Sequence, residues 1–276
     1  MFFTKKSILK ILALISIYFL LGVACGIGYR ALLIIDISVP FLNKLSLFAY
    51  SMCIPIFLIG RSAEGKGILL NAGNKLVRNE LRPADFIDLY NSVKNDTNLV
   101  IANPRIEVLQ QVLLAYDLLD DREMALATVE EMITVAGEKK KAVATITKAS
   151  LLYSHGRVEE AEVLFEQAQK MKLNAMANML MDAVLKGDRA KAIGDYAVAE
   201  AYNLKVLERK FPPLANSEKL VTHYILGEIY EKLQENEKAI FHFQYCLMNG
   251  GETTIRKDAV KKLEELKRDQ TTAIEE

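Results

Sequence analysis

The feature that most constrains this chain is an unbroken run of uncharged, mostly apolar residues near its N-terminus. Residues 11–29 read ILALISIYFLLGVACGIGY, and ten of these 19 residues are Leu, Ile, Phe or Val. About 20 helical residues span the hydrocarbon core of a bilayer. The ten large apolar side chains together favour insertion by about 3 to 6 kcal/mol. We therefore predict a transmembrane helix over about residues 8–29.

A second apolar run covers residues 45–60, with Lys44 and Arg61 at its ends. It includes Pro55, which a membrane helix tolerates where neighbours satisfy the freed carbonyl group. Asp36 and Pro40 lie between the two runs and mark the connecting turn, because an acid at mid-bilayer costs about 2.5 to 3.5 kcal/mol. We predict that residues 1–61 form a transmembrane helical hairpin, with helices at about 8–29 and 45–60, and that residues 8–60 contact the lipid bilayer.

The distribution of basic residues predicts how this hairpin is oriented. Basic residues precede the first predicted helix and follow the second, at Lys5, Lys6, Lys10, Arg61, Lys66, Lys75, Arg78 and Arg82. The positive-inside rule then places both termini and the large following domain in the cytoplasm. The expected location is a bacterial cell membrane, as an integral, multi-pass protein. A cleaved secretory signal is the competing interpretation, and the second apolar run argues against it.

Residues 62–82 join the predicted hairpin to the rest of the chain and are interpreted as a juxtamembrane linker. Apolar residues alternate there with Lys75, Arg78 and Arg82. Such a basic amphipathic stretch either lies on the anionic inner leaflet or forms an ordinary linker helix. Both interpretations stay open at this point.

The charge and cysteine content narrow the function classes. Residues 61–276 hold 30 basic and 34 acidic residues, so this part lacks the basic excess of a nucleic-acid-binding domain, and we predict no nucleic-acid partner. The three cysteines are scattered and form no CxxC pair. The sequence therefore predicts neither a disulfide framework nor a structural zinc site.

Residues 83–270 follow the period of helices throughout. Apolar residues recur three and four positions apart, as in Val108, Val112, Ala115 and Leu119, and no useful length alternates with the strand period. Pro83 suits the first turn of a helix. Residues 254–268 form an amphipathic stretch suited to a capping helix with a polar outer surface. The expected fold class is all-α.

The helical patterns come in pairs, and one pair carries a specific motif. Leu226-Gly227-x-x-Tyr230 is followed by Ala239-x-x-x-Phe243-x-x-Cys246. This resembles the tetratricopeptide repeat, whose first helix carries Leu-Gly-x-x-Tyr and whose second carries Ala-x-x-x-aromatic-x-x-Ala. Small residues stand where two helices cross, and aromatic residues fill the space between them. The resemblance implies an α-solenoid of stacked helical hairpins.

Weaker copies precede this motif. Equivalent alanines stand 36, 38 and 40 residues apart, against a family period of 34, which implies extra turns or longer loops. The copy that contains Gly194 departs most, with Asn203 in place of an aromatic residue. The residues predicted to pack between repeat helices are Tyr116, Ala125, Ala161, Phe165, Ala199, Leu226, Gly227, Tyr230, Ala239, Phe243 and Cys246.

In tetratricopeptide-repeat proteins, partner peptides usually lie in a concave groove formed by the first helices. Carried over by spacing, the groove residues of this chain are Gln110, Leu114 and Asp117 in the first repeat, Ile146, Ser150 and Tyr153 in the second, and Tyr224, Glu228 and Glu231 in the last. The convex face is the alternative binding surface. The family positions that grip a terminal carboxylate hold other residues here, which argues against recognition of a chaperone tail.

A search for chemistry in the sequence yields no catalytic grouping. Residues 60–66 match most of a phosphate-binding loop, but Gly67 stands where Ser or Thr would hold magnesium, and no strand precedes it. His155, His223 and His242 have no metal-ligand spacing. We predict no enzyme activity, no metal and no cofactor. The cluster at Met171, Met176, Met179 and Met181 is interpreted as repeat core.

The sequence thus predicts a membrane-anchored scaffold that recruits a partner protein through a cytoplasmic, tetratricopeptide-like domain. The alternatives are a structural homo-oligomer, or an accessory subunit of a membrane transport or envelope assembly complex. Gly22 and Gly26 have the GxxxG spacing of a helix-dimer interface, which supports a homo-oligomer. The same spacing also allows close packing within one hairpin.

Overall fold

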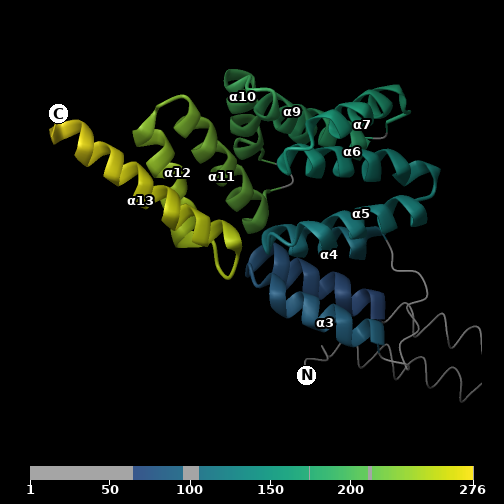
Figure 1. The fold of residues 1–276 in the computed structure, drawn as a ribbon. Coiled ribbons are helices and arrows are strands. Elements are labelled where there is room, and N and C mark those ends of the chain that lie inside the picture. Colours follow the sequence, from purple (N-terminus) through teal and green to yellow (C-terminus); the bar gives the residue numbers. More distant parts are fainter. Residues whose placement is uncertain (1–64, 96–105, 174, 211–212, 276) are drawn as a thin grey trace, which may run out of the picture. The chain divides into compact units, whose positions relative to one another are not determined.

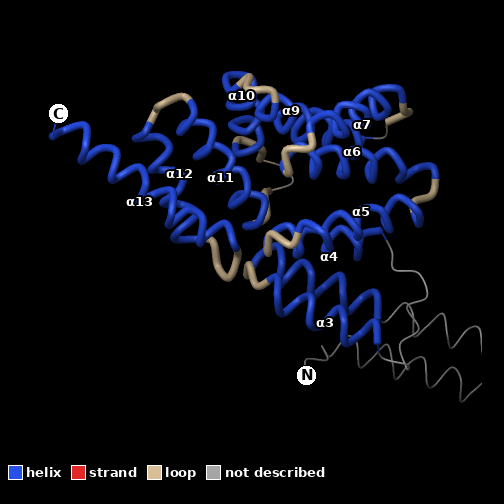
Figure 2. Tube along the Cα trace, viewed as in Figure 1, coloured by secondary structure: helices blue, strands red, loops and turns tan. Residues whose placement is uncertain are grey.

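The computed structural model describes residues 65–95, 106–173, 175–210 and 213–275. Within these ranges every regular element is a helix and no strand occurs, as Figures 1 and 2 show. Both predicted transmembrane helices, together with Gly22 and Gly26, lie outside the described residues. Among the described residues, no helix has the length and apolar character needed to cross a membrane.

The first described helix covers residues 65–79 and ends in a π-helical segment, η1 (Gly73–Asn79); α3 (Pro83–Asn95) follows and starts at Pro83, as predicted. The chain continues with α4 (Ile106–Leu118), α5 (Arg122–Val135), α6 (Glu138–Ser154), α7 (Val158–Lys170), α8 (Ala175–Leu180), η2 (Met181–Leu185), α9 (Lys186–Ala192), α10 (Tyr196–Leu207), α11 (Asn216–Lys232), α12 (Asn236–Asn249) and α13 (Thr254–Glu275). Residues 175–192 are helical without a break, with η2 as a π-helical segment inside one long helix.

Successive helices pack as antiparallel hairpins. The pairs are α4 with α5, α6 with α7, α9 with α10, and α11 with α12, and they follow one another along the chain in Figure 1. The terminal helix α13 packs on α12 through Ala259, Leu263 and Leu266, which are buried. This arrangement is compatible with an α-solenoid.

The four hairpins share one turn geometry. Two residues after the end of each first helix the backbone enters the left-handed region, with φ of 55°, 74°, 83° and 60° at Asp120, Gly156, Gly194 and Gln234 respectively. The N–H of the next residue donates to the carbonyl group five positions back, over 2.8 to 2.9 Å. The carbonyl group of this same residue accepts a hydrogen bond from the N–H of an alanine four residues later, over 3.0 Å. These repeat alanines are Ala125, Ala161, Ala199 and Ala239, and all four are fully buried.

Every residue predicted to pack between repeat helices is buried. In the last hairpin Gly227 lies against the ring of Phe243, and the thiol of Cys246 contacts the Leu220 carbonyl oxygen over 3.6 Å. The third hairpin has the same contact with other residues. There Gly187 lies against Tyr202 and Asn203, and the Asn203 side-chain amide donates to the Ala199 carbonyl over 2.9 Å. A buried asparagine thus takes the place of an aromatic ring.

The segment interpreted as a linker belongs to the folded domain from residue 65 onward. Leu69 and Val77 are fully buried in a core that also includes residues of α4, α5, α11, α12 and α13. The Leu81 carbonyl accepts from the Glu252 N–H over 2.9 Å, and the Asn79 carbonyl accepts from the Asn216 side chain over 2.8 Å. Among the large apolar side chains of residues 65–82, only Ile68 is exposed. This apolar side therefore covers protein, which leaves little of it for a lipid surface.

Candidate functional site

The predicted groove residues occupy three positions of each first helix, which lie 15, 11 and 8 residues before the repeat alanine. The same spacing applied to Ala199 gives Val184, Asp188 and Lys191 in the third hairpin, and the sequence prediction omitted these three. Asp188 and Lys191 lie on α9, and Val184 lies on η2.

Side-chain contacts join these positions across the hairpins. The Ser150 hydroxyl on α6 donates to the Asp188 carboxylate on α9. Lys191 on α9 forms an ion pair with Glu228 on α11, with 2.5 Å between Nζ and Oε2. Glu231 on α11 continues the series and pairs with Lys262 of α13 over 2.9 Å. The first helices α6, α9 and α11 therefore present a polar surface that side-chain contacts join, and Asp117 holds an equivalent position on α4. We call it the first-helix face and define it by Asp117, Ser150, Asp188, Lys191, Glu228 and Glu231.

Asp117 marks the α4 end of this face. Its side chain is exposed to solvent, yet the protein around it raises the pKa of its carboxyl group to about 6, and the nearby carboxylate of Asp120 adds to the shift. Asp117 also lies close enough to Asp188 for its charge to act on that residue's pKa.

Asp188 is the central acid of the first-helix face. Burial raises the pKa of its carboxyl group to about 6, the Ser150 hydroxyl and Lys191 act to lower the pKa, and the charge of Asp117 raises it. The side chain is half-buried. The face holds four carboxylates and one lysine, Lys191, and Lys262 of α13 lies beside it, so the surface is acidic at neutral pH; the carboxylates are Asp117, Asp188, Glu228 and Glu231.

Two predicted groove residues are core residues instead. Ile146 is 1% exposed and Tyr153 is 4% exposed, both within the core of the α6–α7 hairpin. The Tyr153 hydroxyl donates to Glu162 of α7 over 2.9 Å, so its polar end is used inside its own hairpin. α6 packs against α5, α8 and α9 as well as α7. These four neighbours cover more of its surface than its hairpin partner α7 would cover alone.

The other predicted positions keep accessible surface. Gln110, Leu114 and Tyr224 are each partly exposed, and Tyr224 rests its ring against Phe243 with 5.8 Å between the centroids. Leu114 and Tyr224 also pack against the main core, so their outer edges rather than whole side chains face solvent.

The sequence contained the signal that would have found Asp188 and Lys191. Both lie at the same offsets from Ala199 as Glu228 and Glu231 have from Ala239. The third repeat lacks an aromatic residue at position 203, so its motif is weak, and the sequence prediction did not extend the groove positions to it. The position of Ala199 alone is enough to assign the equivalent positions in this repeat.

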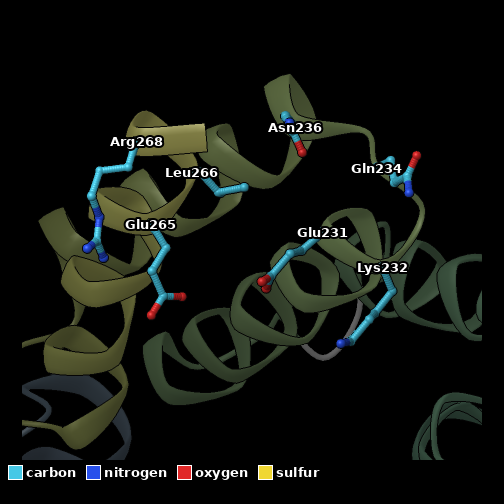
Figure 3. A pocket seen from close by; sticks show the side chains of 7 residues that line it. All are labelled: Glu231, Lys232, Gln234, Asn236, Glu265, Leu266 and Arg268. Carbon is cyan, nitrogen blue, oxygen red and sulfur yellow. The ribbon is translucent and has the colours of Figure 1, made fainter. Parts of the chain in front are cut away.

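A polar depression opens beside the α11 end of the first-helix face. Its volume is about 790 Å³, and it lies between the end of α11, the start of α12 and α13. Figure 3 shows its lining side chains, which are Glu231, Lys232, Gln234, Asn236, Glu265, Leu266 and Arg268. Small-molecule sites are mostly apolar. This depression has mixed charge and a single apolar lining residue, so it does not resemble such a site.

The described residues contain no group of three His, Cys, Asp or Glu side chains that could hold a metal ion. The first-helix face offers four carboxylates, one amine and one hydroxyl group; Ser150 bonds to Asp188, Lys191 pairs with Glu228, and Glu231 pairs with Lys262 of α13. These groups can bind charged and hydrogen-bonding partners. No protein-family model and no curated protein matches this chain.

Proposed function

We propose that this chain is a membrane-anchored scaffold that binds a partner protein through the first-helix face of a tetratricopeptide-like domain. Residues 8–60 anchor the chain in the bilayer as a helical hairpin, and the repeat domain lies in the cytoplasm. The observation that supports the proposal is the series of polar contacts that join equivalent positions of the first helices α6, α9 and α11 in three successive hairpins.

The chemistry of this face favours a basic partner segment. Its carboxylates outnumber its lysines, and Asp117 is both exposed and close to Asp188. A lysine or arginine side chain of the partner placed there would relieve the repulsion between two carboxylates. Opposite charges across an interface also raise the association rate and suppress wrong partners. We therefore propose a partner with an exposed basic segment.

The decisive experiment is affinity capture from solubilised membranes with the full-length chain and a charge-reversal variant. Asp117→Lys reverses one charge on the face at an exposed position, and circular dichroism checks that the helical fold is retained. We expect Asp117→Lys to capture at least tenfold less of the partner than the wild-type chain does. Glu166→Lys is the matched control, because it makes the same charge change at an exposed position of α7. If both variants capture every wild-type partner equally well, the first-helix face is not the binding surface.

The anchor has its own test. We expect the full-length chain to stay with membrane vesicles in alkaline carbonate, and a reporter fused after Glu276 to be active in the cytoplasm. Release of the chain by carbonate would refute the anchored part of the proposal and leave the binding face untouched.

A further inference from the structure

His223 of α11 and His242 of α12 meet through their ring nitrogens. The distance between the two Nδ1 atoms is 2.8 Å, and the ring centroids are 5.0 Å apart. This is the distance of a hydrogen bond, and a hydrogen bond needs one donor and one acceptor. One ring must therefore carry its proton on Nδ1 while the other keeps Nδ1 bare. The pair ties the two helices of the last hairpin together.

The pair tolerates one extra proton but not two. When one imidazole becomes a cation, it still donates its Nδ1 proton to the neutral ring. When both are cations, each Nδ1 carries a proton and no acceptor is left. Two like charges then face each other at hydrogen-bond distance, and the contact is repulsive.

Aromatic rings enclose both imidazoles. His223 stacks on Tyr245 with 3.7 Å between centroids and 14° between planes, and His242 stacks on Tyr230 at 5.4 Å and 20°. The Phe241 ring meets His242 edge-on at 5.2 Å. His242 is only 7% exposed. The imidazoles therefore cannot rotate away from each other without loosening the packing of α11 on α12.

Several charged groups on the helices that pack around α11 and α12 are paired with other groups. Glu200 of α10 accepts the hydroxyl proton of Tyr230 over 2.7 Å. On α12, Lys238 lies over the Tyr230 ring at 4.9 Å and pairs with Glu235 over 2.5 Å. On α13, Lys262 pairs with Glu231, and Asp258 pairs with Lys261 over 3.1 Å. None of these contacts supplies a carboxylate to an imidazole.

We propose that His223 and His242 form an acid-sensitive clasp, which holds α11 to α12 through a shared proton and opens when both rings are protonated. The surroundings support the direction of the effect. Burial lowers the pKa of His223, and burial together with the charge of His223 lowers the pKa of His242 to about 4. A fall from 6.5 to about 4 corresponds to roughly 300-fold weaker proton binding by His242. The clasp goes beyond partner binding, although α11 also carries Glu228 and Glu231 of the first-helix face.

The first test reads the two rings directly. The chain holds three histidines, so full-length protein labelled with ¹⁵N-histidine gives three pairs of ring-nitrogen signals, which single variants assign. At pH 7.5 we expect one of the two clasp rings as the Nδ1–H tautomer and the other as the Nε2–H tautomer. We expect their second protonation well below pH 6. Two Nε2–H tautomers, or two rings that titrate at the ordinary histidine pKa of about 6.5, would overturn the proposal.

The second test compares stability across pH. Replacing both rings by phenylalanine, His223→Phe with His242→Phe, keeps the aromatic packing and removes the protons. Wild type is expected to lose stability on acidification from pH 7.5 to 4, with a roughly 150-fold rise in its unfolding constant from His242, and the double variant to lack that component. His155→Phe, in the turn after α6, is the control; burial also lowers the pKa of His155, so this variant should lose a small part of the acid sensitivity and keep most of it. Equal acid sensitivity in wild type and the double variant would refute the clasp; if the double variant does not fold, the tautomers of the wild type decide.

Discussion

Gly227 of α11 lies directly against the ring of Phe243 in α12. A Cβ atom at Gly227 would stand 2.7 Å from Cε1 of Phe243, and Phe243 is fully buried. The ring has no free space to move into, so Gly227→Ala should destabilise the fold by about 1 to 3 kcal/mol through overpacking. Urea unfolding of the full-length chain, followed by circular dichroism, measures the change.

Gly67 provides the control for this prediction. It also lies in a helix, but a Cβ atom there would meet no heavy atom within 4 Å. Gly67→Ala should therefore stabilise the chain by about 0.5 to 1 kcal/mol, because alanine favours the helix. Loss of similar stability in both alanine variants would show that close approach to Phe243 is not the reason.

The shared turn of the four hairpins makes a second prediction. Gly156 and Gly194 hold the left-handed position in two turns, whereas Gln234 holds it in the last with φ of 60°. A non-glycine residue in this region costs roughly 1 kcal/mol, so Gln234→Gly should stabilise by about that amount.

Gly194→Ala should destabilise by a similar amount, since its φ is 83° and the added Cβ atom would be strained rather than crowded. The two variants change stability in opposite directions at equivalent positions, and thermal unfolding of the pair tests this. A gain in stability from Gly194→Ala would contradict the shared turn geometry.

The all-helical fold and the position of the hairpins could be predicted because both depend on local spacing. Gly227, Ala239 and Phe243 lie within 17 residues, and their small and large side chains already define one hairpin. The alanine register marks the other three hairpins, although Asn203 replaces the expected aromatic ring and still packs against Gly187. Local sequence patterns were therefore enough to predict the helical fold and the positions of the hairpins.

Burial that depends on distant residues could not be predicted in the same way. Nothing near residue 69 indicates that α11–α13 and residue 69 share a core. Ile146 and Tyr153 have the spacing of groove residues, and only the packing of α6 against four other helices buries them. The π-helical segment η2 likewise has no clear signal in MDAVL. Spacing along the sequence thus predicted the positions of the candidate site, and the packing of the helices showed which of these residues are buried.

The position of residues 65–79 makes a third prediction. Leu69 is fully buried, whereas its neighbour Ile68 is 39% exposed. If this helix belongs to the domain core, Leu69→Ala should destabilise by about 2 to 5 kcal/mol, because it removes buried apolar atoms and leaves a cavity.

The neighbouring variant Ile68→Ala is the matched control and should cost less than about 1 kcal/mol. Unfolding of the two full-length variants in urea distinguishes a core helix from a linker. Small effects of equal size in both variants would indicate that residues 65–82 are a linker and not part of the domain core.

The raised pKa of Asp188 leads to a last prediction, on pH and stability. The carboxyl group of Asp188 has a folded pKa of about 6, against about 3.8 when unfolded. The folded state therefore binds the proton more tightly, so this group contributes stability below pH 3.8 and loses that contribution as the pH rises through about 6. Asp188→Asn removes the charge and keeps an acceptor for Ser150. It should stabilise the chain at pH 8 by on the order of 1 to 3 kcal/mol, and the gain should vanish near pH 4.

Lys191 sets the limit of that gain, since it acts to lower the pKa of Asp188 and already pairs with Glu228. The measurement is the free energy of unfolding at pH 4, 6 and 8 for wild type and Asp188→Asn. Asp182→Asn is the control, because Asp182 pairs with Lys186 over 2.6 Å at the exposed surface, where such pairs contribute little. A loss of stability at pH 8 in Asp188→Asn would mean that the charged carboxylate is held favourably by Lys191. The first-helix face would then carry less unrelieved negative charge for a basic partner than we propose.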